Sequence, residues 1–66
     1  MKIGKVIKSL RLERNLTQLQ LSKEIGVSQK AIDYWERAVN EPKATYIAAL
    51  AVYFNVTSDY LLGLEK

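Results

Sequence analysis

Residues 17–37, with the sequence TQLQLSKEIGVSQKAIDYWER, constrain the fold more than any other stretch of the chain. Thr17 is suited to cap a helix, and Gln20 follows at the spacing that completes a capping box. Ser28 is suited to cap a second helix. Between the two caps, Gly26 can adopt a positive φ without steric cost, so the chain can turn after about two helical turns. We therefore expect two short helices joined by a tight turn.

The second of these helices, about residues 28–37, has an apolar and a polar side. At helical spacing Ala31, Ile32 and Trp35 share one side, which predicts a packing face. The other side carries five hydrogen-bonding side chains, from Gln29, Lys30, Asp33, Tyr34 and Arg37. Because a major groove admits one α-helix and presents hydrogen-bonding base edges, this side is suited to reading double-stranded DNA.

Two structural alternatives remain open for the polar side. Arg37 stands four residues after Asp33, a spacing at which the two charges can pair on the helix surface. Tyr34 can cover the helix against solvent instead of contacting a base. Trp35 is assigned to the core because it shares the side of Ile32.

Three further helices are predicted around this pair. Apolar spacing predicts a helix over residues 3–14 and another beginning near Ala44. Each is followed by an asparagine suited to the left-handed conformation, Asn15 and Asn55. Thr57 is suited to cap a fifth helix. Since no strand-like alternation occurs, the fold class is all-α, a compact five-helix bundle containing a helix-turn-helix.

Length and residue types restrict the possible functions. A chain of 66 residues allows one domain, residues 1–66, with one shared core. It contains no histidine and no cysteine, so the usual proton shuttle and metal ligands are missing. We predict no enzyme activity, catalytic residue, metal, cofactor or small-molecule substrate. No apolar run approaches the roughly 20 residues of a membrane span and no signal-peptide core is present, so we expect a cytoplasmic protein without membrane contact.

Positive charge is concentrated near the N-terminus. The net charge is +3, whereas the first fourteen residues alone carry +4, from Glu13 against five basic side chains: Lys2, Lys5, Lys8, Arg11 and Arg14. Lysines in the first turn of a helix oppose its macrodipole at about 0.3–1 kcal/mol each, which favours an anionic partner such as phosphate. The alternative is a solvated cationic surface that keeps the protein soluble.

The stretch 17–37, together with Pro42 and the later VTSDYLLG, resembles the lambda-repressor-like family of helix-turn-helix domains, which includes phage repressors and Cro proteins. The resemblance covers nearly the whole chain. It is most specific in the TQ that opens the first short helix, the IGVS turn, the WER segment and the SDYLLG ending. It implies a sequence-specific DNA-binding transcriptional regulator, and we expect a repressor that inserts residues 28–37 into the major groove of an operator.

The resemblance also implies roles for single residues. It places Gln29, Lys30 and Tyr34 at base-reading positions. Contacts with phosphate or the DNA backbone are implied for five residues: Gln18, Ser28, Arg37, Asn40 and Lys43. For Gln18 the structural alternative is a polar residue in the first helical turn. The family also pairs the basic residue at Arg11 with the acid at Glu36, and we expect that ion pair here.

Two positions depart from the family pattern. Ala38 stands where family members usually have glycine, so the backbone there must either be strained or adopt another geometry. Lys43 stands where a helix-capping serine is frequent, so the start of the fourth helix is expected to fray.

We expect a symmetric homodimer on DNA, because one recognition helix of about two turns reads too few base pairs for useful specificity. The pairing surface is expected around the fourth and fifth helices, including Leu62 and Leu64. The rival hypothesis is a protein-interaction module, such as an antitoxin or adaptor, that binds DNA weakly or not at all. The salt dependence of duplex binding distinguishes the two, because only DNA binding releases counterions.

Overall fold

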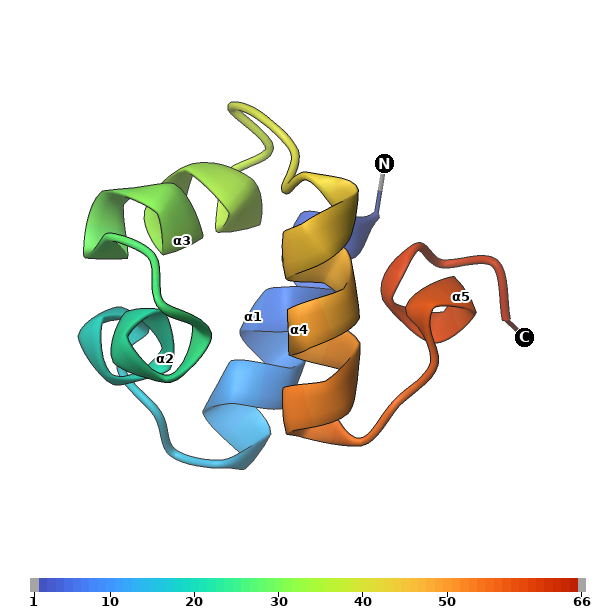
Figure 1. Cartoon of the computed structure of the whole chain (residues 1–66), viewed down its shortest axis with the longest axis horizontal. Helices are drawn as coiled ribbons and strands as arrows, with labels where there is room; N and C mark the ends of the chain where they lie inside the picture. Colours follow the sequence, from blue (N-terminus) through green and yellow to red (C-terminus); the bar gives the residue numbers. More distant parts are fainter. Residues whose placement is uncertain (1, 66) are drawn as a thin grey trace.

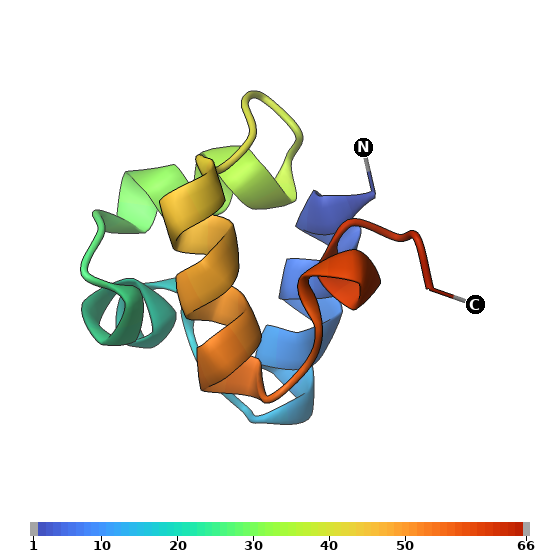
Figure 2. The same cartoon turned by 45° about the vertical axis from the view of Figure 1, so that its right-hand side comes forward.

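A computed structural model describes residues 2–65, which form five α-helices and contain no strand (Figure 1). In chain order the helices are α1 (Ile3–Glu13), α2 (Gln18–Ile25), α3 (Gln29–Glu36), α4 (Ala44–Phe54) and α5 (Ser58–Leu61). Helices α1 and α4 stand in the middle, with α2 and α3 on one side and α5 on the other (Figure 1, Figure 2). The predicted all-α, five-helix fold is confirmed. In the part of the chain that the structure describes, no helix is long and apolar enough to cross a membrane.

Three helices begin at the side-chain caps that the sequence predicts. The Thr17 hydroxyl oxygen accepts a hydrogen bond from the Gln20 N–H at 3.0 Å, and the Gln20 side-chain oxygen accepts from the Thr17 N–H at 2.8 Å, which closes the capping box. The Ser28 hydroxyl oxygen caps α3 by accepting from the Ala31 N–H at 3.1 Å. The Thr57 hydroxyl oxygen caps α5 by accepting from the Tyr60 N–H at 3.0 Å. Such caps typically stabilise by about 1 kcal/mol each. Helix α4 lacks one, because the Lys43 side chain at its N-cap position accepts no hydrogen bond.

Within two residues of the end of every helix, a single residue adopts the left-handed backbone conformation, with φ between 56° and 85°. These residues are Asn15, Gly26, Ala38, Asn55 and Gly63. After each of them, the next N–H closes the turn on a carbonyl oxygen five residues back, at 2.8 to 3.0 Å. Glycine adopts this conformation without penalty and asparagine tolerates it. Alanine adopts it only with strain. Of the two alternatives expected at Ala38, a strained backbone or another geometry, the structure therefore has the strained one, at a cost of about 1–2 kcal/mol.

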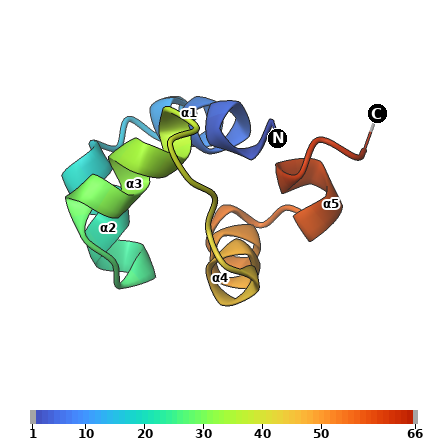
Figure 3. The same cartoon turned by 90° about the horizontal axis from the view of Figure 1, so that it is seen from above.

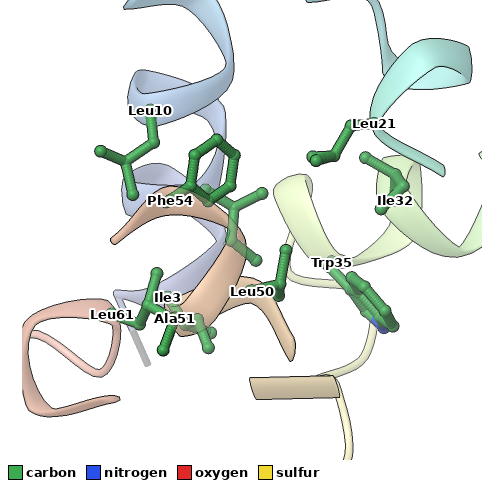
Figure 4. Packing of buried hydrophobic residues seen from close by; sticks show 10 residues of the cluster. Ile3, Leu10, Leu21, Ile32, Trp35, Leu50, Ala51, Phe54 and Leu61 are labelled. Carbon is green, nitrogen blue, oxygen red and sulfur yellow. The ribbon is translucent and has the colours of Figure 1, made fainter. Parts of the chain in front are cut away.

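The core lies between all five helices, and its side chains converge in Figure 4. It comprises Ile3, Ile7, Leu10, Leu21, Ile32, Trp35, Leu50, Ala51, Phe54 and Leu61. Trp35 is only 5% exposed and its ring centroid lies 5.7 Å from that of Tyr46, so its assignment to the core is confirmed. Ile47 of α4 is half-buried and packs against this core.

Helix α1 crosses α3 at close range next to Gly4, which is buried. A Cβ atom at Gly4 would overlap the carbonyl oxygen of Trp35 and lie 3.1 Å from that of Glu36. The close approach of the two helices therefore requires glycine at this position. It places the C-terminal end of α3 against the start of α1.

Candidate nucleic-acid interface

Helix α3 lies beside α2 at the edge of the molecule (Figure 3). Its inner side is fixed by Ile32, which is fully buried, and by Trp35. The opposite side is open to solvent to different extents: Gln29, Lys30 and Arg37 are exposed, and Asp33 and Tyr34 are half-buried. The division into a packing side and a polar side therefore follows the predicted pattern.

A buried ion pair holds the end of α3 to α1. The Arg11 Nε donates to Glu36 Oε2 at 2.7 Å, and the Arg11 Nη2 donates to Glu36 Oε1 at 2.9 Å, so the pair is bidentate. Their side chains are 10% and 3% exposed. The hydrogen bond with Glu36 raises the pKa of Arg11 above its usual range. The Arg11 Nη1 also donates to the Leu16 carbonyl at 2.8 Å. The expected ion pair is present.

Gln18, the first residue of α2, is hydrogen-bonded to α3. Its side-chain Nε2 donates to Glu36 Oε1 at 3.2 Å and to Asp33 Oδ1 at 3.3 Å. Phosphate oxygens only accept hydrogen bonds, and the two N–H groups of this amide already have acceptors. A phosphate contact by Gln18 therefore needs its backbone N–H, at the N-terminus of a helix where anions are favoured, or an exchange of one carboxylate for a phosphate.

Asp33 and Arg37 form the surface ion pair that the sequence leaves open as an alternative. Two nitrogens of Arg37 lie close to Asp33 Oδ2, Nε at 2.9 Å and Nη2 at 2.8 Å. The Arg37 side chain is 58% exposed and the Asp33 side chain 35% exposed. The hydrogen bond from Arg37, and next that from Gln18, lowers the pKa of Asp33. The pairing leaves Arg37 Nη1 free of Asp33, so pairing and a DNA contact are compatible for Arg37.

Two cations lie near the ring of Tyr34 on the outer side of α3. The Lys30 Nζ lies 5.3 Å from the ring centroid, and the Arg37 Cζ lies 5.5 Å from it. Both distances are within the range of attractive cation–π contacts. Tyr34 is thus half-buried on the helix surface with the two charges beside its ring.

The remaining predicted contact residues lie around α3. Ser28, Asn40 and Lys43 are exposed. The Ser28 oxygen accepts from the Ala31 N–H, which leaves its own O–H available to donate. The loop from α3 to α4 contains Asn40 and also Val39, a 56% exposed residue that the sequence did not single out.

The structure changes the interpretation of the N-terminal positive charge. Arg14 donates to the carbonyl oxygens of Tyr53 at 3.2 Å and of Phe54 at 3.0 Å, at the C-terminal end of α4. Its guanidinium carbon lies 5.2 Å from the Phe54 ring centroid. Like Arg11, it therefore helps to hold the helices together, so these two arginines have a structural role that needs no anionic partner. No local sequence signal joins Arg14 to residues about forty positions away.

The amino-acid sequence of this chain is similar to those of known helix-turn-helix proteins. The sequence profile of the helix-turn-helix family matches residues 7–61. Over 60 residues, which are 91% of this chain and 28% of the relative, the chain is 37% identical to repressor protein C2 of Salmonella phage P22. Over 66 residues, which are all of this chain and 32% of the relative, it is 35% identical to the HTH-type transcriptional activator BcrR of Enterococcus faecalis. The chain spans less than a third of the length of both relatives.

A solved structure of the P22 c2 repressor in complex with a synthetic operator has a TM-score of 0.89 with this chain, at 35% identity and 96% coverage of both chains. The chain therefore belongs to the helix-turn-helix family, and its resemblance to lambda-repressor-like domains is confirmed.

Proposed function

We propose that this chain is the sequence-specific DNA-binding domain of a transcriptional regulator and that α3 enters the major groove of an operator. The observation that carries the proposal is the outer side of α3, where exposed amide, ammonium and guanidinium groups are presented by a helix fixed at its inner side. The same fold in the P22 c2 repressor has been solved with a synthetic operator, which supports the proposal. We assign repression, because a domain that occupies an operator can block transcription without a further module.

The proposed contacts fall into two classes. Base edges are read by Gln29, Lys30 and Tyr34, which project from the outer side of α3. The DNA backbone is contacted by Gln18, Ser28, Arg37, Asn40 and Lys43, which surround that side. The first class specifies the sequence, and the second fixes the position of the domain on the duplex.

On DNA the proposed species is a symmetric homodimer with half-sites about 34 Å apart. The proposed pairing surface lies around α4 and α5. It includes Val52 of α4, which is 82% exposed, and two residues that follow α5, the half-buried Leu62 and the 69% exposed Leu64. In this role the chain acts in the cytoplasm as a binding protein. It needs no cofactor and catalyses no reaction.

Selection of bound duplexes from a random pool tests the proposal, followed by titration of the selected duplex at several salt concentrations. We expect a repeated or inverted half-site and an affinity that falls steeply with salt, by about 0.9 log units per log unit of salt for each phosphate neutralised. Binding that stays at background for every duplex would refute the proposal and favour the protein-interaction module.

A pair of substitutions then separates the two classes of contact. The Gln29 amide can bind adenine N6 and N7 together, so Gln29→Ala should cost about 1–3 kcal/mol at the preferred site and relax the preference at one base pair. Lys43→Ala should weaken binding to all sequences alike and reduce the salt slope by about one. Lys23→Ala, at an exposed position in the last turn of α2, is the matched control for lost charge. Equal losses on every sequence for Gln29→Ala would show a backbone contact instead.

A further inference from the structure

A continuous set of side-chain contacts crosses the outer side of α3. Gln18 donates to Asp33 at 3.3 Å, and Asp33 pairs with Arg37 at 2.8 Å. Arg37 and Lys30 then lie 5.5 and 5.3 Å from the centroid of the Tyr34 ring. One end of this set is thus tied to α2, and the other end is the exposed ammonium of Lys30.

The two cationic groups of this set are hydrogen-bond donors only. An ammonium group has three N–H donors and no acceptor, and the guanidinium of Arg37 likewise has none. In the major groove guanine presents two adjacent acceptors, N7 and O6, without a donor beside them. Adenine presents N7 beside its N6 amino donor, thymine presents O4 beside a methyl group, and cytosine presents an amino donor. Guanine is therefore the base whose edge best matches a fixed ammonium.

The location of Lys30 favours a base over a phosphate. Lys30 is the second residue of α3, in its first turn, and the first turn of a recognition helix is the part that contacts base edges. Its ammonium lies 5.3 Å from the centroid of the Tyr34 ring on the same helix, a distance at which the ring attracts it.

We propose that Lys30 selects operators with guanine opposite the start of α3 by donating to guanine N7 and O6, and that Tyr34 is the positioning residue for its ammonium. This assignment rests on the proposed function and adds the identity of the base. Asp33 takes part through Arg37, because it pairs with this arginine, whose guanidinium also lies near the Tyr34 ring.

The experiment measures the affinity of the full chain for its selected duplex and for the same duplex with 7-deazaguanine at single guanines, a base that lacks the N7 acceptor. Each guanine is also replaced by adenine, with its pairing base changed to match. The wild-type chain should lose about tenfold or more in affinity at one guanine of each half-site, as expected for a good base contact. Lys30→Met, which keeps the length of the side chain but not the charge, should bind the altered and unaltered duplexes equally.

Two substitutions at Tyr34 test its positioning role. Tyr34→Phe keeps the ring and should retain the wild-type preference ratio for guanine over 7-deazaguanine. Tyr34→Leu keeps an apolar side chain without the ring and should reduce that ratio, whatever happens to overall affinity. Circular dichroism verifies that all variants are folded. The preference ratio is the deciding measurement, because a merely structural effect would alter affinity for all duplexes alike.

The outcomes separate this assignment from the proposed function. If the wild-type chain binds no duplex, the proposed function fails and the assignment fails with it. If it binds with a steep salt dependence but tolerates 7-deazaguanine everywhere, or if Lys30→Met still discriminates, only the assignment is overturned. A salt slope that Lys30→Met then reduces by about one would show that Lys30 contacts a phosphate instead.

Discussion

Removing one partner of the Arg11–Glu36 ion pair should destabilise the fold far more than replacing both with apolar residues. The pair is almost fully buried, with side chains 10% and 3% exposed. In Glu36→Leu the guanidinium of Arg11 would retain, of its present acceptors, only the Leu16 carbonyl at 2.8 Å. In Arg11→Met the Glu36 carboxylate would retain, of its present donors, only the Gln18 amide at 3.2 Å.

The size of the effect follows from this burial. A buried charge left without its partner costs about 3–5 kcal/mol. A domain of this length is stable by only about 3–10 kcal/mol, at the usual stability per residue, so either single variant approaches unfolding. In Arg11→Met/Glu36→Leu no charge remains to be desolvated, and apolar replacement of a buried pair is often close to neutral. The coupling energy between the two sites should therefore be several kcal/mol.

Urea unfolding followed by circular dichroism measures the four members of this cycle. All four are measured in the same concentration of trimethylamine N-oxide, which stabilises folded states and keeps the single variants folded at low urea. Arg11→Lys with Glu36→Gln forms a second, milder cycle in which helix packing is less disturbed. Single-variant losses that add to the double-variant loss within about 0.5 kcal/mol would refute the reasoning, because independent sites behave in that way.

Three other predictions concern the backbone and the surface of α3. Gly4→Ala should lower the free energy of unfolding by about 1–3 kcal/mol or more in urea, because its methyl group would overlap the Trp35 carbonyl; an unchanged midpoint would mean that α1 moves freely from α3. Ala38→Gly should stabilise by about 0.5–1 kcal/mol, since relief of the left-handed alanine exceeds the added chain entropy, and should raise Tm by a few degrees; a lower Tm would contradict this. Asp33 should titrate below its usual pKa in an NMR titration, and Arg37→Gln should raise that pKa. Since the pKa is lower in the folded state, the contribution of Asp33 to stability is present above the ordinary aspartate pKa of about 3.9 and is lost as the pH falls through the folded value. An Asp33 pKa that Arg37→Gln leaves unchanged would show that the ion pair is not the cause.

The helix boundaries could be predicted from the sequence because their signals are local. Thr17 and Ser28 bond to backbone groups three residues away, and Asn15 and Gly26 act on the turn in which they lie. Such contacts form whatever the neighbouring helices do. The two sides of α3 were predictable for the same reason, since helical spacing alone places Ile32 inward.

Contacts between distant helices could not be predicted from these signals. The contact of Arg14 with the end of α4 and the approach of Gly4 to α3 depend on how the helices cross. The Arg11–Glu36 pair came from the family resemblance, and no spacing rule gives it. The two carboxylates that bind Gln18 were likewise not anticipated. The DNA roles of the outer residues stay predictions, because a base-edge contact depends on the geometry of the duplex as well as of the protein.

The left-handed helix ends also bear on how quickly the chain folds. Each helix is stopped by residues directly next to it, so none has to wait for a distant segment in order to end. Isolated helices form in about 0.1–1 μs, and helical domains with mostly local contacts fold in microseconds to milliseconds. We expect this chain to be in that class. A domain that recloses so quickly after opening exposes its interior to proteases only in proportion to its small unfolded population, so its lifetime in a cell follows its stability rather than its rate of unfolding.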